Sequence, residues 1–126
     1  MKAIRINNIV DFDNTLNQIL SEENYTKLFT LFFGTELSET DESWCPDCVI
    51  ADPKIRKYAN QVENCILLEC PVGDRNSYKG NAKHHYKIHT EVNLKAIPTL
   101  IEWTQHGPGK RLIEEECADD DKLKAF

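Results

Sequence analysis

Two cysteines separated by two residues, Cys45 and Cys48, constrain this chain more than any other feature of its sequence. They stand in the stretch Trp44-Cys45-Pro46-Asp47-Cys48. Thiols at this spacing can bind a metal ion, form a structural disulfide, or exchange a disulfide with another molecule. Each use requires different surroundings, so the rest of the sequence decides among them.

The cellular compartment expected from the sequence argues against a structural disulfide. The chain has five cysteines, an odd number, and residues 1–8 alternate polar and apolar side chains without the apolar core of a signal peptide. No apolar run approaches the ~20 residues that a membrane span requires. We therefore expect a cytoplasmic protein without a membrane partner, in which thiols stay reduced and a cysteine pair is redox-active or metal-binding.

The other metal-binding side chains are poorly placed for a zinc site, which needs four ligands. Cys65 and Cys70 fall at opposite faces of one apolar segment. His85 and His89 are four residues apart, with His84 beside them, on a polar segment where solvated histidines are commoner than ligands. We therefore expect no bound metal, and disulfide exchange is the favoured use of the cysteine pair.

The remaining cysteines are expected to be structural. If residues 65–72 form a strand, Cys65 and Cys70 lie ~16 Å apart, whereas a disulfide requires Cα atoms within ~7 Å. These two residues cannot bridge each other. We expect both, together with Cys117, to pack as small apolar side chains.

Hydrophobic periodicity predicts an α/β protein with a central mixed β-sheet flanked by helices on both faces. No repeat or linker divides the chain, so residues 1–126 are expected to form a single domain. The segment 35–43 is polar and predicts a loop. We predict strands at 4–6, 25–33, 65–72, 99–103 and 111–115, and helices at 11–20, 48–61, around 83–89 and from 118 onward.

Two details of these elements follow from particular residues. Pro53 lies inside the helix predicted over 48–61, where it removes a backbone donor and should kink the axis. The glycine-rich stretch from His106 to Gly109 predicts the turn of an antiparallel hairpin. The positions of the 48–61 helix expected to face inward are Val49, Ile55, Tyr58 and Val62.

The charge distribution excludes one class of partner. The formal net charge is −6, with acidic runs at 114–116 and 119–121. Such a surface repels phosphate backbones, so we expect no nucleic-acid partner. The acidic runs themselves are typical of a solvated face.

A position at a helix N-terminus would give the two thiols different roles. The unpaired N–H groups and the helix dipole stabilise a negative charge there, so Cys45 should ionise below the ~8.5 of a free thiol and act as the nucleophile. Pro46 suits the first turn because it has no donor to leave unpaired. Cys48 lies one turn on, facing inward, and suits the resolving role. The Asp47 carboxylate disfavours the thiolate, which favours a reductase over an oxidant.

These residues resemble the thioredoxin superfamily. The resemblance lies in Trp44 to Cys48, in Pro53 five residues after the second cysteine, and in Ile97-Pro98-Thr99. The longer stretch Ser43 to Cys48 (SWCPDC) is similar to one subgroup of that superfamily, and the likeness covers nearly the whole chain. It implies a thioredoxin-like fold and a protein-disulfide reductase.

The resemblance also implies roles for individual residues. Cys45 is expected to be the nucleophile and Cys48 the resolving cysteine of a redox-active pair, with Pro46 and Asp47 tuning its potential. Pro98 is expected to be a cis-proline facing the site. The backbone of Ile97 is then expected to pair with a bound substrate. For Trp44, a docking role and simple packing over the helix start stay open.

One departure from ordinary thioredoxins concerns proton transfer. The segment 25–33 contains no acidic residue, so it supplies no buried carboxylate to take the proton of Cys48. Water, Asp47 or another group would have to take it. The loop 35–43 is expected to rim the nucleophile and narrow the choice of substrate.

The expected activity is that of a monomeric thiol-disulfide oxidoreductase with no bound cofactor. By resemblance, its electrons come from NADPH through thioredoxin reductase, and its substrates are small disulfides such as cystine and selected protein disulfides. Two alternatives stay open: a non-catalytic interaction module on the same scaffold, and a glutathione-dependent, glutaredoxin-like reductase. The sequence shows no basic pocket for glutathione carboxylates beside Pro98, although Lys95 keeps the question open.

Overall fold

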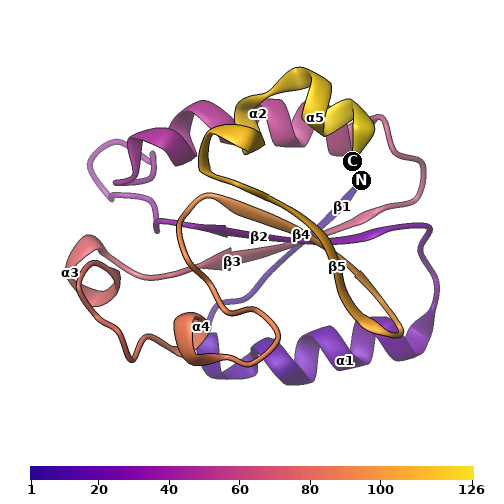
Figure 1. Cartoon of the computed structure of the whole chain (residues 1–126), viewed down its shortest axis with the longest axis horizontal. Coiled ribbons are helices and arrows are strands. Elements are labelled where there is room, and N and C mark those ends of the chain that lie inside the picture. The colour runs from indigo at the N-terminus through magenta and orange to yellow at the C-terminus, as the bar shows by residue number, and fades with distance from the viewer.

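The apolar segments of the chain form one five-stranded sheet with the strand order β1-β3-β2-β4-β5 (Figure 1). The computed structural model describes residues 1–126. Strands β1, β3 and β2 are parallel, and the β4–β5 hairpin is antiparallel. The strands are β1 (Lys2–Arg5), β2 (Leu28–Phe33), β3 (Ile66–Pro71), β4 (Thr99–Thr104) and β5 (Gly107–Ile113).

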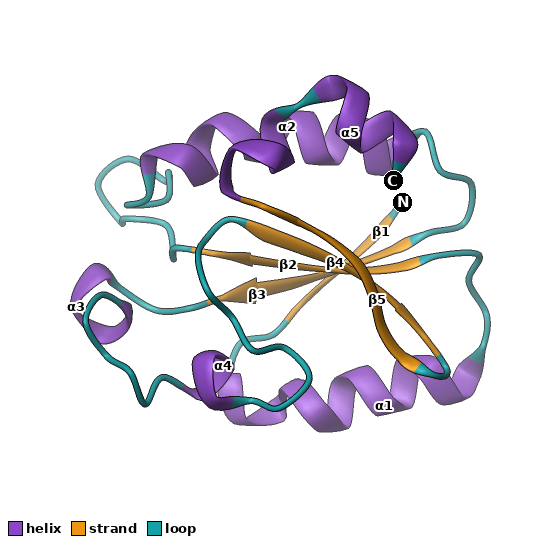
Figure 2. Ribbon diagram, viewed as in Figure 1, coloured by secondary structure: helices purple, strands orange, loops and turns teal.

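Helices cover both faces of this sheet (Figure 2), which confirms the predicted mixed α/β class. Helices α1 and α4 lie on one face, and α2 and α5 lie on the other. The helices are α1 (Phe12–Glu22), α2 (Pro46–Asn60), α3 (Arg75–Tyr78), α4 (His85–Ile88) and α5 (Asp120–Ala125), with 3-10 turns at Ile9–Asp11 and Glu114–Ala118. None of these helices combines the length and apolarity needed to span a membrane.

The central strand β2 explains the unbroken apolar run in the sequence. Every side chain of Leu28–Phe33 is buried, because helices cover the sheet on both sides at this strand. Its hydroxyl-bearing residue, Thr30, accepts a hydrogen bond from the indole N–H of Trp103 at 2.8 Å. The polar group is therefore satisfied inside the core.

The predicted α1 helix is confirmed, since Phe12, Leu16 and Ile19 are buried on one face. Phe12 packs edge-on against Tyr86 of α4, with ring centroids 5.2 Å apart. This contact ties α4 to α1, and the Tyr86 ring also packs edge-on against Phe32 of β2, with centroids 4.9 Å apart. The α3–α4 segment thereby becomes a fixed wall near the carboxyl ends of the strands.

The prediction for the inward face of α2 was partly wrong. Ile55 is buried as expected, but Val49, Tyr58 and Val62 are only half-buried. The helix also begins at Pro46, two residues before the predicted start. The buried stripe of α2 combines Ile55 with three small side chains that allow close approach to the sheet, Cys48, Ala51 and Ala59.

The predicted hairpin is confirmed, but its turn lies earlier than expected. Thr104 pairs with Gly107, so the turn consists of two residues, Gln105 and His106. Gly107, with φ of +111°, opens β5 rather than forming the turn. Strand β5 then ends at Ile113, because Glu114 adopts a left-handed φ of 53° and starts a 3-10 turn.

Candidate active site

Cys45 occupies the N-cap of α2, one residue before the helix starts. Its backbone is extended, with φ −93° and ψ 111°, and its Sγ accepts a hydrogen bond from the backbone N–H of Cys48 at 3.3 Å. Pro46 follows in the first turn, where its missing donor leaves no bond unmade. The placement expected from the sequence is therefore the one observed.

The two thiols are in direct contact. Cys48 donates a hydrogen bond from its thiol to Cys45 Sγ at a separation of 2.6 Å, and both cysteines are free. This bond, together with the Cys48 backbone N–H, lowers the pKa of Cys45 from 9.0 to about 7, while burial and the Asp47 carboxylate oppose the shift. The pKa of Cys48 is raised well above its ordinary value, because it donates to Cys45 and is buried. Cys45 is the thiol that ionises first.

The peptide bond between Ile97 and Pro98 is cis, as the resemblance implied. The Ile97 carbonyl accepts a hydrogen bond from the Cys45 thiol at 3.9 Å, and neither backbone group of Ile97 bonds to another backbone group. Strand β4 starts only at Thr99. The backbone N–H of Ile97, beside Cys45, therefore has no partner within the protein.

Trp44 is held in place by contacts inside the protein. Its indole N–H donates to the Gly73 carbonyl at 2.8 Å, and its ring centroid lies 6.3 Å from that of Tyr78. A Cβ on Gly34 would come within 2.6 Å of the indole, so only glycine fits beneath it. Trp44 is half-buried, packs against the hydrophobic core and lines the same cavity as Cys45.

The two sulfurs border different cavities. Cys45 is only 6% exposed, but it lines a cavity of about 350 Å³, called the Cys45 cavity below, between the start of α2 and the α3–α4 segment. Cys48 lines a separate cavity of about 290 Å³ on the other side, called the Cys48 cavity, together with Pro98. Each sulfur therefore has its own surroundings, Cys45 in the first cavity and Cys48 in the second.

The prediction that the loop 35–43 rims Cys45 holds only for Ser43, whose hydroxyl accepts a hydrogen bond from the Cys45 backbone N–H at 3.1 Å. Glu36, Asp41, Glu42 and Ser43 of this loop line the Cys48 cavity and not the Cys45 cavity. The loop folds back on itself through the bridge between Glu36 and Ser43, which carries it over the resolving side of the site. The nucleophile is instead bordered by the α3–α4 segment.

The positions of the nearby carboxylates decide which of them could take the proton of Cys48. Asp47 lines the Cys45 cavity, so it lies on the wrong side of the pair. The carboxylate one turn beyond Cys48 on α2 is Asp52, which lines the Cys48 cavity and accepts bonds from Arg56 at 3.0 Å. Arg56 also pairs with Glu69 at 2.6 Å. Sequence reasoning missed Asp52, although its spacing of four residues from Cys48 marks the same helix face.

The other cysteines and the histidines have structural contacts. Cys65, Cys70 and Cys117 are buried, and burial raises the pKa of each thiol, to about 12 for Cys117. His84 contacts the Val72 carbonyl and His89 contacts Asp13, each at 2.7 Å. No three side chains of the kinds that bind metals are grouped together.

Sequence reasoning also missed most of the Cys45 cavity. Its wall carries Tyr78 and a set of basic side chains of which only Lys95 was considered from the sequence. A signal was present, since basic residues recur every fourth position from 75 to 87. The basic residues that line the cavity are Arg75, Lys79, Lys87 and Lys95.

A mixed sheet with a cysteine pair at a helix N-terminus, facing a cis-proline, defines a thioredoxin-like fold. Solved structures agree: thioredoxin O2 from Arabidopsis thaliana in its oxidised state superimposes with a TM-score of 0.64 at 14% identity, over 98% of this chain and 90% of that one. The family model described as thioredoxin domain-containing protein 17-like, thioredoxin domain, matches residues 6–126. The chain belongs to this family.

Curated relatives agree with this assignment. Thioredoxin domain-containing protein 17 of Mus musculus is 32% identical over 102 residues, which are 80% of this chain and 77% of that protein. The thioredoxin-like protein Clot of Arabidopsis thaliana is 33% identical over 108 residues, 83% of this chain and 80% of that one. The family relationship thus supports thiol-disulfide oxidoreductase chemistry as the general class of activity.

Proposed function

We propose that this protein is a disulfide reductase that works through a mixed disulfide. The observation that carries the proposal is the contact between Cys45 and Cys48 at the N-terminus of α2, with Cys45 facing a cavity and Cys48 behind it. This arrangement supplies a nucleophile that is ionised near neutral pH and a second thiol within bonding reach.

The reaction has two exchange steps. The Cys45 thiolate attacks one sulfur of the substrate, so that its S–S bond breaks, a mixed disulfide forms and the first product leaves as a thiolate that takes up a proton. Cys48 then loses its proton and attacks Cys45 Sγ, which releases the second product and leaves a Cys45–Cys48 disulfide. Two electrons have passed from the pair to the substrate.

The pair must then be reduced again. Thioredoxin reductase, which draws electrons from NADPH, is the proposed partner for this step, and the protein needs no cofactor of its own. Small disulfides such as cystine and selected protein disulfides are the proposed substrates, and the proposed working form is a cytoplasmic monomer. The unpaired backbone N–H of Ile97 beside Cys45 supports pairing with an extended substrate segment.

A coupled assay tests the proposal. NADPH consumption is followed with thioredoxin reductase, cystine or insulin, and the wild-type protein, Cys45→Ser or Cys48→Ser. Turnover is expected for the wild type and none for Cys45→Ser. Cys65→Ser is the matched control, because a serine can keep the bond that Cys65 donates to the Ala59 carbonyl. Unchanged turnover by Cys45→Ser would rule out Cys45 as the nucleophile, and no turnover by the wild type would leave the scaffold as an interaction module only.

A second candidate function is favoured by the basic side chains of the Cys45 cavity. Glutathione carries two carboxylates, and four basic residues border the nucleophile. In this case glutathione, regenerated by glutathione reductase, would reduce the pair. Replacing thioredoxin reductase with these two components in the same assay distinguishes the candidates.

A further inference from the structure

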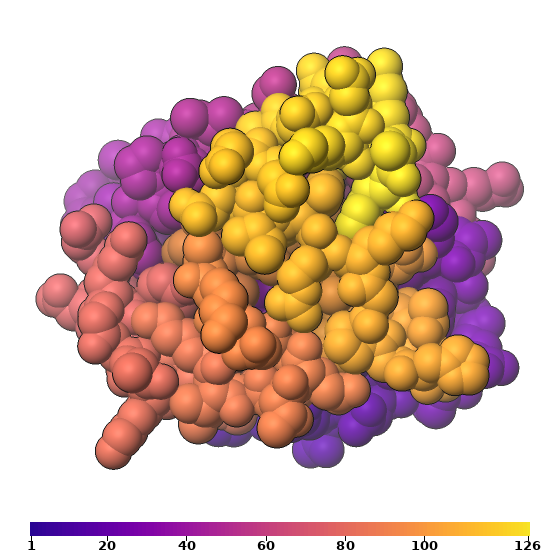
Figure 3. All heavy atoms as spheres, viewed as in Figure 1, coloured from indigo at the N-terminus to yellow at the C-terminus, as the bar shows by residue number.

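The Cys45 cavity has a charge opposite to that of the protein as a whole. The formal net charge of the chain is −6. Around this cavity, however, four basic side chains face two acidic ones, which are Asp47 and Glu114. The segment from α3 to residue 98, which carries all four basic residues, covers the lower left of the face shown in Figure 3. The basic residues are Arg75, Lys79, Lys87 and Lys95.

These four basic side chains have no partner of opposite charge in the protein. Seven ion pairs exist, and none includes any of the four. Lys87 is nevertheless held in place, because its Nζ donates to the Tyr78 carbonyl at 2.6 Å and lies 4.1 Å from the centre of the Tyr78 ring. The other three, Arg75, Lys79 and Lys95, are exposed to solvent. Their charges are available to a bound anion.

Tyr78 provides an independent sign of a ligand. Its side chain is 4% exposed and lines the cavity, yet its hydroxyl is buried and makes no hydrogen bond. A buried hydroxyl without a partner costs free energy, and such groups commonly meet a ligand or water. Burial and the nearby charges of Cys45 and Cys48 raise the pKa of Tyr78 to about 12, so the hydroxyl keeps its proton and can donate.

The cavity is the right size for a small molecule. Its volume of about 350 Å³ lies at the lower end of the range for ligand sites. It is lined by Cys45 and by Ile97, so a molecule in it would touch the sulfur that attacks and the backbone beside it.

We propose that the Cys45 cavity selects small disulfides that carry carboxylates within a few bonds of the sulfur atoms. The basic side chains bind the carboxylates, and the Tyr78 hydroxyl donates to a substrate oxygen or to the sulfur that leaves as a thiolate. This inference rests on the proposed disulfide reductase function and names the substrate class of that site. The bonds made and broken are those of the two exchange steps already described.

Three disulfides of similar size and different charge test this selection. They are 3,3′-dithiodipropionate, which is dianionic, bis(2-hydroxyethyl) disulfide, which is neutral, and cystamine, which is dicationic. Each oxidises the pre-reduced full-length protein in excess, and loss of the Cys45 thiol is followed by mass spectrometry. Each rate constant is divided by that of the same disulfide with 2-mercaptoethanol, which removes differences in intrinsic reactivity.

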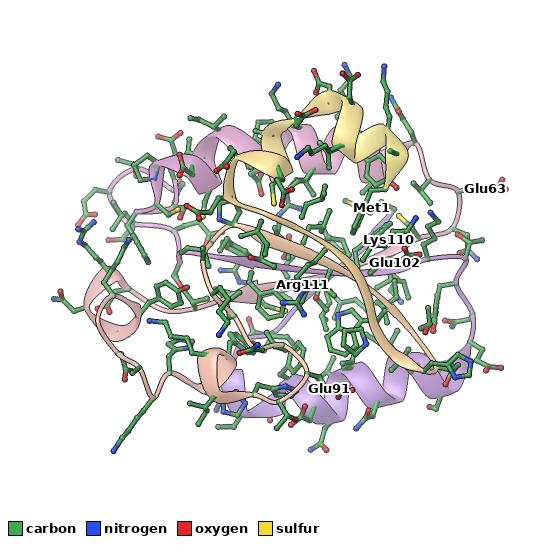
Figure 4. The ribbon with its side chains drawn as sticks, viewed as in Figure 1. Met1, Glu63, Glu91, Glu102, Lys110 and Arg111 are labelled. Atoms are coloured by element: carbon green, nitrogen blue, oxygen red, sulfur yellow. The ribbon has the colours of Figure 1, made fainter.

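The normalised rate constant should be highest for the dianion, lower for the neutral disulfide and lowest for the dication, and added salt should reduce these differences. In the double variant Lys79→Glu, Lys95→Glu, the ratio of the dianion rate to the dication rate should fall by roughly fivefold or more, since each surface pair contributes a factor of up to about five. Lys110→Glu is the matched control. Lys110 is exposed, has no ion pair and lies on β5, well away from α3 (Figure 4), so the ratio should not change.

The outcomes separate the two proposals. If the wild type reacts with none of the three disulfides, the proposed function fails. If it reacts with all three at equal normalised rates, or if the double variant keeps the wild-type ratio, the charge selection is overturned while the reductase function stands.

Discussion

The thiol of Cys48 lies 2.6 Å from the sulfur of Cys45, yet the two residues line cavities on opposite sides of the pair. In the proposed reaction, attack and resolution therefore occur in different surroundings. Basic side chains and a buried hydroxyl border Cys45, whereas mainly acidic residues border Cys48. Substitutions can therefore be directed to one side of the pair at a time.

Asp47 is predicted to raise the pKa of the nucleophile. Cys45 titrates at about 7, and the Asp47 carboxylate opposes ionisation. Below this pH the thiol holds its proton and reacts slowly, and above it the thiolate reacts, so alkylation should rise through about pH 7. Asp47→Asn removes the repulsion and should shift the curve to lower pH. Iodoacetamide labelling against pH, read by mass spectrometry, measures both curves, and a shift to higher pH would contradict the account.

Tyr78→Phe should impair exchange without destabilising the fold. The Tyr78 hydroxyl has no hydrogen bond to lose, so the free energy of unfolding should change by less than about 1 kcal/mol. Exchange between Cys45 and the dianionic disulfide should slow several-fold. Tyr86→Phe is the control, since the Tyr86 hydroxyl is also buried but lies beside the Cys70 thiol and outside the Cys45 cavity. Equal effects of the two substitutions on the exchange rate would refute the assignment.

Asp52→Asn is predicted to slow resolution alone. Asp52 and Cys48 line the same cavity, and proton transfer by a positioned group typically contributes a factor of ~100 or more. Because water can substitute in part, we expect decay of the mixed disulfide to slow by roughly tenfold. Rapid acid quenching and mass spectrometry follow this decay.

Arg56→Lys serves as the control for Asp52→Asn, because it perturbs the same ion pair and leaves the carboxylate in place. Alkylation of Cys45 should be unchanged in both variants. If Asp52→Asn resolves the mixed disulfide at the wild-type rate, water and not Asp52 takes the proton of Cys48.

Gly34→Ala is predicted to disturb the site through Trp44. The new Cβ would lie 2.6 Å from the indole and 2.8 Å from the Ser43 hydroxyl, so the ring must move and lose its bond to the Gly73 carbonyl. We expect a loss of about 1–3 kcal/mol in the free energy of unfolding, measured in urea.

A double-mutant cycle isolates the contact between Gly34 and Trp44. In a Trp44→Ala background, the same substitution at Gly34 should cost much less, because the ring is absent. If the cost is equal in both backgrounds, crowding against Trp44 does not explain the glycine.

Local pattern was enough to predict the sheet and the presence of helix α2, although not the residue at which the helix starts. The apolar run 28–33 and the cysteine pair before Pro53 each predict one element, and neighbouring residues supply the physics. The buried face of α2 was harder, because small residues such as Ala51 and Ala59 carry little hydrophobic signal. The position of the turn depended on Gly107, which serves equally well in a turn or at the start of a strand.

The segments that surround Cys45 could not be predicted from local sequence patterns. Which loop borders Cys45 depends on packing between segments far apart in the chain, such as the contact of Phe12 with Tyr86. Arg75 and Lys87 lie on two separate helices of four residues each, and Lys79 and Lys95 lie outside any helix, so the four residues share no helical face. Only the folded chain places them together.

The trapping of a mixed disulfide tests the central claim most directly. Cys45→Ser and Cys48→Ser are each reduced, treated with a carboxylate-bearing disulfide at neutral pH, and weighed intact by mass spectrometry. Cys48→Ser should gain the mass of one substrate half on Cys45 and retain it, whereas Cys45→Ser should remain unmodified. A stable adduct on Cys48 in the Cys45→Ser protein, with none on Cys45 in the other variant, would contradict the assigned roles.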